Sequence, residues 1–185
     1  MGGAEYMKSI KKYETIINEA LRSALEYDTP EGQINEFISF FGKHIGSDRI
    51  YIFEDDEEHH VTNNTYEWCT EGITPQIEHL QGVNMEVIDW WYDTFDEGKS
   101  VIISDVEELK GVHQVSYNML KYQNVRKVVV SPLRHKGQIK GFFGVDNPPA
   151  VDYNALTMFL DMIGTMLISL LKIRNTFGME KNIIL

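Results

Sequence analysis

Residues 128–149 read VVVSPLRHKGQIKGFFGVDNPP, a stretch that predicts two neighbouring antiparallel strands. The strands cover Val125–Leu133 and Gln138–Val145, which contain many of the β-branched and aromatic residues that favour sheets. Arg134-His135-Lys136-Gly137 joins them as a hairpin turn, because glycine adopts a positive φ angle at little cost. Asn147-Pro148-Pro149 then ends the second strand, since proline has no N–H to donate.

Further strands are predicted upstream of this hairpin. Arg49–Phe53 and Val61–Thr70 alternate as strands and flank a charged hairpin tip, EDDEE, at residues 54–58. Val101–Ile103 adds a short strand. The middle of the chain therefore supplies most of a sheet.

Helical periodicity fills the intervals between the strands and both ends of the chain. Thr29 before Pro30 is a typical helix start, and Gly46 is a typical helix end. The predicted helices are Glu5–Tyr27, a second that runs to about Ile45, a short one opened by Thr74-Pro75, Met85–Glu97 with Asn84 as its cap, Ser104 to about Tyr122, and a final one of about 25 residues capped by Asp152.

The first and last helices each carry an apolar stripe in alternating steps of four and three residues. The stripes consist of Tyr6, Ile10, Tyr13, Ile17, Ala20, Ala24 and Tyr27, and of Leu156, Leu160, Ile163, Leu167, Leu170, Arg174 and Phe177. One interpretation is that the last helix is clamped between the sheet and the first helix. We favour the other, in which part of its apolar arc is a dimer seam shared with the first helix.

Composition limits the possible partners. The chain has 185 residues and a net charge of -11, which disfavours binding to nucleic acid or to an anionic membrane. A single cysteine, Cys69, excludes an internal disulfide and a multi-cysteine zinc site. Residues 1–10 lack the apolar core of a signal peptide, and the apolar tract Met158–Leu171 is interrupted by Asp161. We therefore expect a cytoplasmic protein.

The order of elements, together with the segment Val128–Pro149, resembles a GAF domain. An apolar run, Pro-Leu, a glycine turn, and then glycine with apolar residues and asparagine are typical of the last hairpin of that family. Gly98–Asp105 resembles the strand before the second pocket helix of GAF domains. The ending GFFGVDNP at residues 141–148 is most similar to GAF modules joined to diguanylate cyclase (GGDEF) output domains.

This resemblance implies an α+β, GAF/PAS-like fold with a central antiparallel sheet. It places the terminal helices on one face and the pocket helices on the other. The expected organisation is an N-terminal signalling helix over residues 1–28, a sensory domain over 29–177, and a tail over 178–185 that leads to a missing output domain. The implied function is sensory: a small molecule is bound, and its occupancy is transmitted through the terminal helices of a homodimer. The alternative is a ligand-free dimerisation module with a collapsed pocket.

Aromatic residues are the main candidates for a ligand pocket, because such pockets are mostly apolar. Adjacent tryptophans on a helix point about 100° apart, so one can line a cavity while the other packs elsewhere. The alternative is that the tryptophans are ordinary core residues. The predicted ligand-binding residues are Trp68, Cys69, Val87, Trp90, Trp91, Phe95 and Ser131.

Two of these candidates have strong structural alternatives. Ser131 can bond locally beside Pro132, and Cys69 can be an inert buried thiol. Known cysteine-dependent GAF activities do not fit, since methionine-sulfoxide reductases of this type need several cysteines. Bilin-binding relatives commonly have His after the attachment cysteine, where this chain has Thr70.

No catalytic residue, cofactor or metal site is predicted. His59 and His60 lie beside the acidic residues 55–58, but adjacent residues on a strand point to opposite faces, which disfavours a shared metal ion. We favour a solvated hairpin tip here. Phe95-Asp96-Glu97 does not reproduce the spaced motif of cyclic-nucleotide-binding GAF domains. No arrangement for a nucleophile or a phosphate-binding glycine loop is present, so we do not expect an enzyme.

Overall fold

Six strands form one antiparallel sheet in a computed structural model that describes residues 3–149 and 152–183, with side chains described to residue 176. The strand order is β3-β2-β1-β6-β5-β4. The strands are β1 (Arg49–Asp56), β2 (Val61–Cys69), β3 (Val83–Asn84), β4 (Val101–Ile103), β5 (Val128–His135) and β6 (Gln138–Asp146). Because β1 pairs with β6, Arg49 lies directly opposite Asp146 at the end of both strands.

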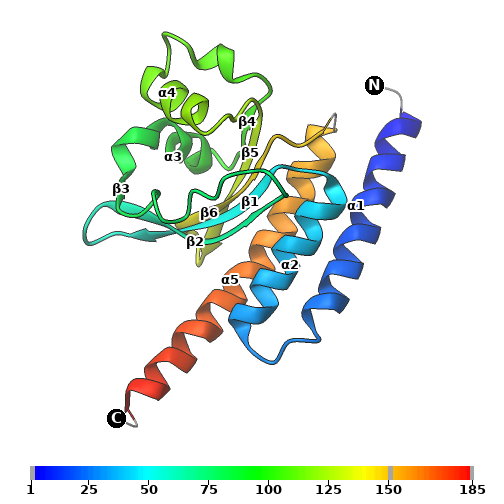
Figure 1. Cartoon of the computed structure of the whole chain (residues 1–185), viewed down its shortest axis with the longest axis vertical. Helices are drawn as coiled ribbons and strands as arrows, with labels where there is room; N and C mark the ends of the chain where they lie inside the picture. The colour runs from blue at the N-terminus through cyan, green and yellow to red at the C-terminus, as the bar shows by residue number, and fades with distance from the viewer. Residues whose placement is uncertain (1–2, 150–151, 184–185) are drawn as a thin grey trace.

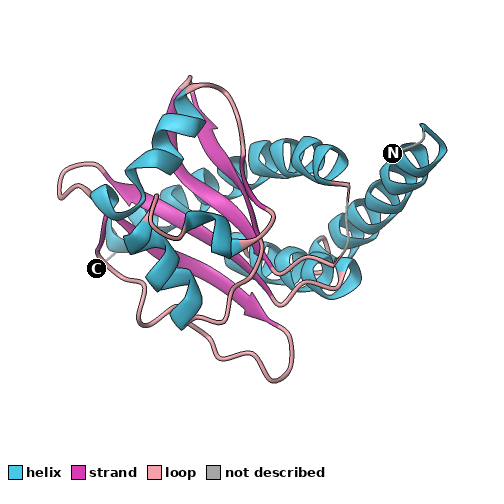
Figure 2. Cartoon of the chain, turned by 90° about the horizontal axis from the view of Figure 1, so that it is seen from above, coloured by secondary structure: helices cyan, strands magenta, loops and turns pink. Residues whose placement is uncertain are grey.

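Helices cover both faces of this curved sheet (Figures 1 and 2). The long helices α1 (Gly3–Ala24), α2 (Pro30–Ile45) and α5 (Tyr153–Ile183) lie on one face. The short helices α3 (Asp89–Asp96) and α4 (Gln114–Tyr122) lie on the other, with 3-10 turns at Met85–Ile88 and Val106–Leu109. The predicted α+β architecture is therefore confirmed.

Local helix signals act as the sequence predicts. The Thr29 hydroxyl accepts a hydrogen bond from Gly32 N, and Gly46 ends α2 with a φ of 78°. Asn84 and Asp152 cap their helices through Glu86 N and Ala155 N. These contacts satisfy N–H groups that a helix start leaves without a partner.

Two predicted helices in the middle of the chain are wrong in part. Residues 74–80 form turns rather than a helix, because the Thr74 carbonyl accepts from Arg49 instead of from a following helical turn. The expected helix from Ser104 to Tyr122 is divided into a 3-10 turn and α4. Gly111 lies between them with a φ of 77°, a value that interrupts a right-handed helix.

The final helix is longer than predicted, with 31 residues rather than about 25. Its backbone stays helical through 178–183, most of the segment expected to be a tail. Residues 184 and 185 lie outside the described part of the chain, as does the side chain of Phe177.

Both predicted apolar stripes pack within this chain. Tyr13 and Ala20 of α1 are buried, and the Tyr13 ring lies 5.8 Å from that of Phe159 in α5. Leu160 and Leu167 of α5 are fully buried in the same core. These contacts agree with the interpretation of a clamped helix. Other apolar residues of the described helices remain exposed, among them Met7 and Leu21 of α1 and Met158, Met162 and Ile173 of α5.

The α5 segment Tyr153–Thr176 is long and apolar enough to cross a membrane by length and composition. Core helices of soluble proteins pass the same test. Leu156, Leu160, Ile163, Leu167 and Leu171 of this segment are buried in the layer formed with α1, α2 and the sheet. Its apolar character is therefore explained in large part by packing.

Two glycines inside helices allow a matched test of this packing. A Cβ at residue 42 would overlap the ring of Trp68, whereas a Cβ at residue 164 would meet Leu133 Cδ2 at an ordinary 3.5 Å. We expect Gly42→Ala to lower the free energy of unfolding by about 1–3 kcal/mol, because overpacking is costly. Gly164→Ala should raise it by roughly 0.5–1 kcal/mol through helix propensity. Urea denaturation measures both, and equal effects would contradict the described Gly42–Trp68 packing.

Candidate ligand-binding cavity

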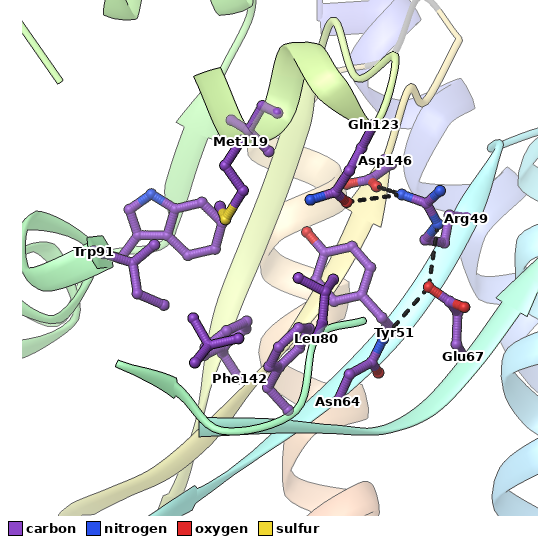
Figure 3. A pocket seen from close by; sticks show the side chains of 14 residues that line it. Arg49, Tyr51, Asn64, Glu67, Leu80, Trp91, Met119, Gln123, Phe142 and Asp146 are labelled. Carbon is purple, nitrogen blue, oxygen red and sulfur yellow. Dashed lines mark hydrogen bonds and ion pairs between the residues drawn. The ribbon is translucent and has the colours of Figure 1, made fainter. Parts of the chain in front are cut away.

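A small cavity lies on the face of the sheet that α3 and α4 cover (Figure 3). Its volume is about 40 Å³, room for only a few water molecules. One end is polar and the other is apolar. The cavity is lined by Arg49, Tyr51, Phe53, Asn64, Glu67, Leu80, Val83, Ile88, Trp91, Met119, Leu120, Gln123, Phe142 and Asp146.

Three buried charges form the polar end, and we call Arg49, Glu67 and Asp146 the Arg49 cluster. Arg49 Nη1 donates to Asp146 Oδ2 at 2.8 Å, and Arg49 Nε lies 3.2 Å from Glu67 Oε1. All three side chains are at most 3% exposed. They come from three adjacent strands, β1, β2 and β6. Charges this deeply buried need partners, because desolvation is costly.

The same guanidinium also holds two segments that cover the cavity. Arg49 Nη2 donates to the carbonyl of Thr74 at 3.0 Å, and Nη1 donates to Gln123 Oε1 at 3.3 Å. Glu67 Oε2 accepts from the backbone N–H groups of Gln76 and Ile77, at 2.8 and 3.0 Å. The loop after β2 and the end of α4 are thus attached to the sheet through the Arg49 cluster.

Asp146 has an unusual environment within this cluster. Burial raises the pKa of Asp146 to about 6, although the charge of Arg49 opposes the change. Burial and the neighbouring Asp146 together raise the pKa of Tyr51, which therefore stays protonated. Gly144 makes room for Tyr51, since a Cβ there would overlap the tyrosine ring. The Oδ1 atom of Asp146 is buried and has no hydrogen-bond partner.

Aromatic rings form the apolar end. The Phe142 ring stacks on Phe53 with centroids 4.7 Å apart, and Trp91 meets Phe142 edge-on at 5.5 Å. Met119 of α4 and Leu80 of the loop after β2 close the cavity from above the sheet. Offset and edge-on aromatic contacts of this kind are favourable and make a rigid wall.

Of the seven predicted ligand-binding residues, the structure places only Trp91 in the lining of this cavity. Val87, Trp90 and Phe95 belong to the same apolar cluster but lie outside the lining. The other three are placed as follows: Trp68 packs against the helical layer on the opposite face, Ser131 is fully buried and bonded to Ser100, and Cys69 is half-buried opposite Arg49.

Trp90 is directed toward α4 instead. Its Nε1 donates to Ser116 Oγ at 3.0 Å, and its ring stacks on His113 at 4.3 Å. Ser116 in turn donates to the carbonyl of Val87 at 3.1 Å. Trp90 and Val87 therefore hold α4 over the sheet rather than touching the cavity.

Cys69 has the environment of an inert thiol. Burial, the largest effect, raises its pKa, although the neighbouring Arg49 opposes this. A raised pKa keeps the sulfur protonated, and the protonated form is a poor nucleophile.

Sequence reasoning missed the polar end of the cavity. Arg49 begins one predicted strand, and Asp146 directly follows another. A signal was available in the sequence, because each of these charged residues stands at the end of a predicted strand that is otherwise mostly apolar. The pairing of β1 with β6, which brings the two together, is not visible in either segment alone.

The described residues contain no group of three or more His, Cys, Asp and Glu side chains that could hold a metal. His59 pairs with Asp56 at 2.7 Å on the exposed hairpin tip.

The raised pKa of Asp146 predicts a pH dependence of stability. The folded protein retains at Asp146 a proton that the unfolded chain, with an ordinary pKa of 3.8, has already lost. The contribution of Asp146 to the free energy of unfolding therefore falls as pH rises through about 6, and is nearly constant above about pH 7. Relative to Asp146→Asn, the wild type should lose on the order of 1 kcal/mol between about pH 5 and about pH 7.5.

Urea denaturation across that range measures the difference. Asp28→Asn is the control, because Asp28 is exposed and far from the cavity in the connection between α1 and α2. A difference between wild type and Asp146→Asn that does not change with pH would contradict the assigned environment.

The architecture of this chain is similar to that of several solved structures. No family model matches the chain, and no curated protein matches it. Solved structures do. The GAF domain of a phosphoenolpyruvate-protein phosphotransferase from Coxiella burnetii has a TM-score of 0.69 at 10% identity, covering 91% of this chain and 98% of that one.

Two ligand complexes are also similar in structure. The phycocyanobilin-bound GAF domain of a cyanobacterial phytochrome has a TM-score of 0.66 at 16% identity, covering 85% of this chain and 94% of that one. The free methionine-R-sulfoxide reductase of Neisseria meningitidis, solved with its substrate, has a TM-score of 0.66 at 12% identity, covering 90% and 92%. At these identities the likeness concerns the fold. This chain has the fold of the GAF domains.

Proposed function

We propose that this chain is a sensory GAF module that binds a small molecule in the cavity beside the Arg49 cluster. The observation that carries the proposal is the combination of a buried polar cluster and an aromatic wall around one cavity. Ligand pockets are usually apolar with a few well-placed polar groups, and this cavity has that character.

The small volume of the cavity requires that its cover moves when a ligand enters. A volume of about 40 Å³ is well below the several hundred Å³ typical of ligand pockets. Met119 and Leu80 are the lining residues that we expect to shift when a ligand enters, because they belong to α4 and to the loop after β2 rather than to the sheet. Both segments are attached through Arg49, so ligand binding and the position of the cover are linked.

The proposed output runs through the long helices of a homodimer. Met158, Met162 and Ile173 of α5 are 41–61% exposed although α5 otherwise packs in the core. A second copy of this chain is the proposed occupant, since these residues recur at helical spacing along one helix. Ligand binding would act on the dimer only if it favours one arrangement of the helices over another.

A diguanylate cyclase is the proposed recipient of the signal. The support is the sequence GFFGVDNP at residues 141–148, which resembles GAF modules joined to such domains. A cytoplasmic location and a regulatory rather than an enzymatic role belong to the same proposal.

A second candidate function is a dimerisation module that binds no ligand. The small volume of the cavity favours this alternative, because side chains already fill most of the space. The two candidates differ in whether any molecule of a few hundred daltons occupies the cavity.

Native mass spectrometry of the protein as purified separates the two candidates. We expect twice the 21.4 kDa chain mass and an added few hundred daltons per subunit, because a ligand held under the cover is released slowly. Trp91→Phe should remove the added mass or weaken binding about tenfold, since Trp91 forms the cavity wall. Trp68→Phe is the control, because Trp68 lies on the opposite face of the sheet. A bare dimer, unaffected by either change, would favour the dimerisation module.

The proposed dimer surface has its own test. Met162→Glu should convert the dimer to a monomer, because it places a buried charge in an apolar contact. Val115→Glu is the matched control, since Val115 on α4 is as exposed as Met162, at 61%. Sedimentation or light scattering gives the mass. A wild-type monomer, or a dimer that persists in Met162→Glu, would contradict this surface.

A further inference from the structure

The Arg49 cluster carries an excess of negative charge. It contains two carboxylates, Glu67 and Asp146, and one guanidinium. Among the described residues that line the cavity, Arg49 is the only one with a positive charge. With both carboxylates ionised, the cluster has a net charge of -1, and an incoming ligand meets that charge in a nearly dry environment.

The positive charge of Arg49 is already committed to partners within the protein. Its Nη1 donates to Asp146 and Gln123, and its Nη2 donates to Thr74, whereas its Nε lies 3.2 Å from Glu67 Oε1 without forming a hydrogen bond. The carboxylate of Glu67 is similarly occupied, since its Oε2 accepts from two backbone N–H groups. An anionic ligand that approached Arg49 would therefore lie beside the carboxylates of Asp146 and Glu67.

Asp146 is the member of the cluster with an acceptor to spare. Its Oδ2 pairs with Arg49, whereas its Oδ1 is buried and makes no hydrogen bond of normal geometry, although a contact with the Tyr51 hydroxyl lowers the pKa of this carboxylate. A buried acceptor without a donor costs free energy that a suitable ligand group would recover. The Tyr51 hydroxyl and the Gln123 amide lie on the cavity side of the Arg49–Asp146 pair in Figure 3.

The opposite end of the cavity specifies the rest of the ligand. Trp91, Phe142 and Leu80 present rings and an aliphatic chain. Trp91 Nε1 has no partner either, but in Figure 3 it lies on the side of the ring away from the Arg49 cluster. Trp91 therefore offers mainly its ring surface to the cavity.

We propose that the cavity recognises a small molecule with an N–H donor, cationic or amide, which binds Asp146 Oδ1, and an apolar body, which packs on Trp91 and Phe142. Anionic ligands are disfavoured, because the cluster already has a net charge of -1 and the free oxygen of Asp146 repels them. This inference rests on the proposed sensory function and adds the class of ligand. It also assigns to Asp146 the role of the specificity-determining residue.

Three probes of one shape test this assignment. Benzamidine is cationic, benzamide is a neutral N–H donor, and benzoate is an anion of nearly the same size. Calorimetry and thermal denaturation of the whole chain at about pH 7.5 should show binding in the order benzamidine, benzamide, benzoate. We expect at least about a tenfold difference between the first and the last.

Asp146→Asn should weaken benzamidine binding about tenfold or more and reduce the preference over benzoate. Asp28→Asn, on the exposed connection between α1 and α2, should change neither.

Wild-type affinity for benzamidine should also increase from about pH 5 to about pH 7.5, because burial raises the pKa of Asp146 to about 6. The other charged or titratable groups facing Asp146 are Arg49, Glu67 and Tyr51, and the high pKa of Tyr51 keeps it neutral over this range.

The outcomes separate this inference from the proposed function. Benzoate binding as tightly as benzamidine, or unchanged benzamidine affinity in Asp146→Asn, would overturn the inference and leave a ligand-binding module. No binding of any probe at millimolar concentration, together with no added mass on the purified protein, would overturn both. If Asp146→Asn does not fold, the order in which the wild type binds the three probes and the pH dependence of its benzamidine affinity still test the inference. A captured ligand without an N–H donor would also contradict it.

Discussion

The contact between Arg49 and Asp146 is the interaction on which the arrangement of this chain most depends. The two residues are 97 positions apart and meet because β1 and β6 are neighbours in the sheet. Through its remaining donors Arg49 also holds the loop after β2 and the end of α4. Removing one partner of such a buried pair typically costs about 3–5 kcal/mol, since the other charge is left without compensation.

This arrangement places the polar end of the cavity at the junction between sheet and cover. The sheet side is rigid, because aromatic rings of β1 and β6 pack closely on one another and on Trp91. The cover side is formed by short segments that are attached through the polar contacts of Arg49 and through apolar packing on the same cluster of side chains. In the proposed function, a ligand that binds Asp146 acts next to the guanidinium that holds the cover, and this is the proposed physical route from ligand binding to movement.

The helical layer on the other face of the sheet is held together mainly by apolar packing. Most of the apolar stripe of α5 is used within the chain, against α1, α2 and the sheet. Exposed large apolar side chains remain on both terminal helices and beside them, chiefly Met7, Leu25, Met158, Met162 and Ile173. The proposed ligand-binding face and the proposed dimer face are thus separated by one sheet, whose strands have alternate side chains in each layer.

Local chemistry was enough to predict most of the helices and strands and the caps at Thr29, Asn84 and Asp152. The caps depend on residues within a few positions of one another, whereas the α+β fold was predicted from the order of the elements and the resemblance to GAF domains. The extent of α5, the absence of a helix after Thr74 and the composition of the cavity required the tertiary structure. Arg49 captures a carbonyl that a local helix would use, and the partners of Asp146 come from distant strands. Sequence patterns reveal which face of an element is apolar, whereas the pairing of strands far apart in the chain decides which charged groups meet.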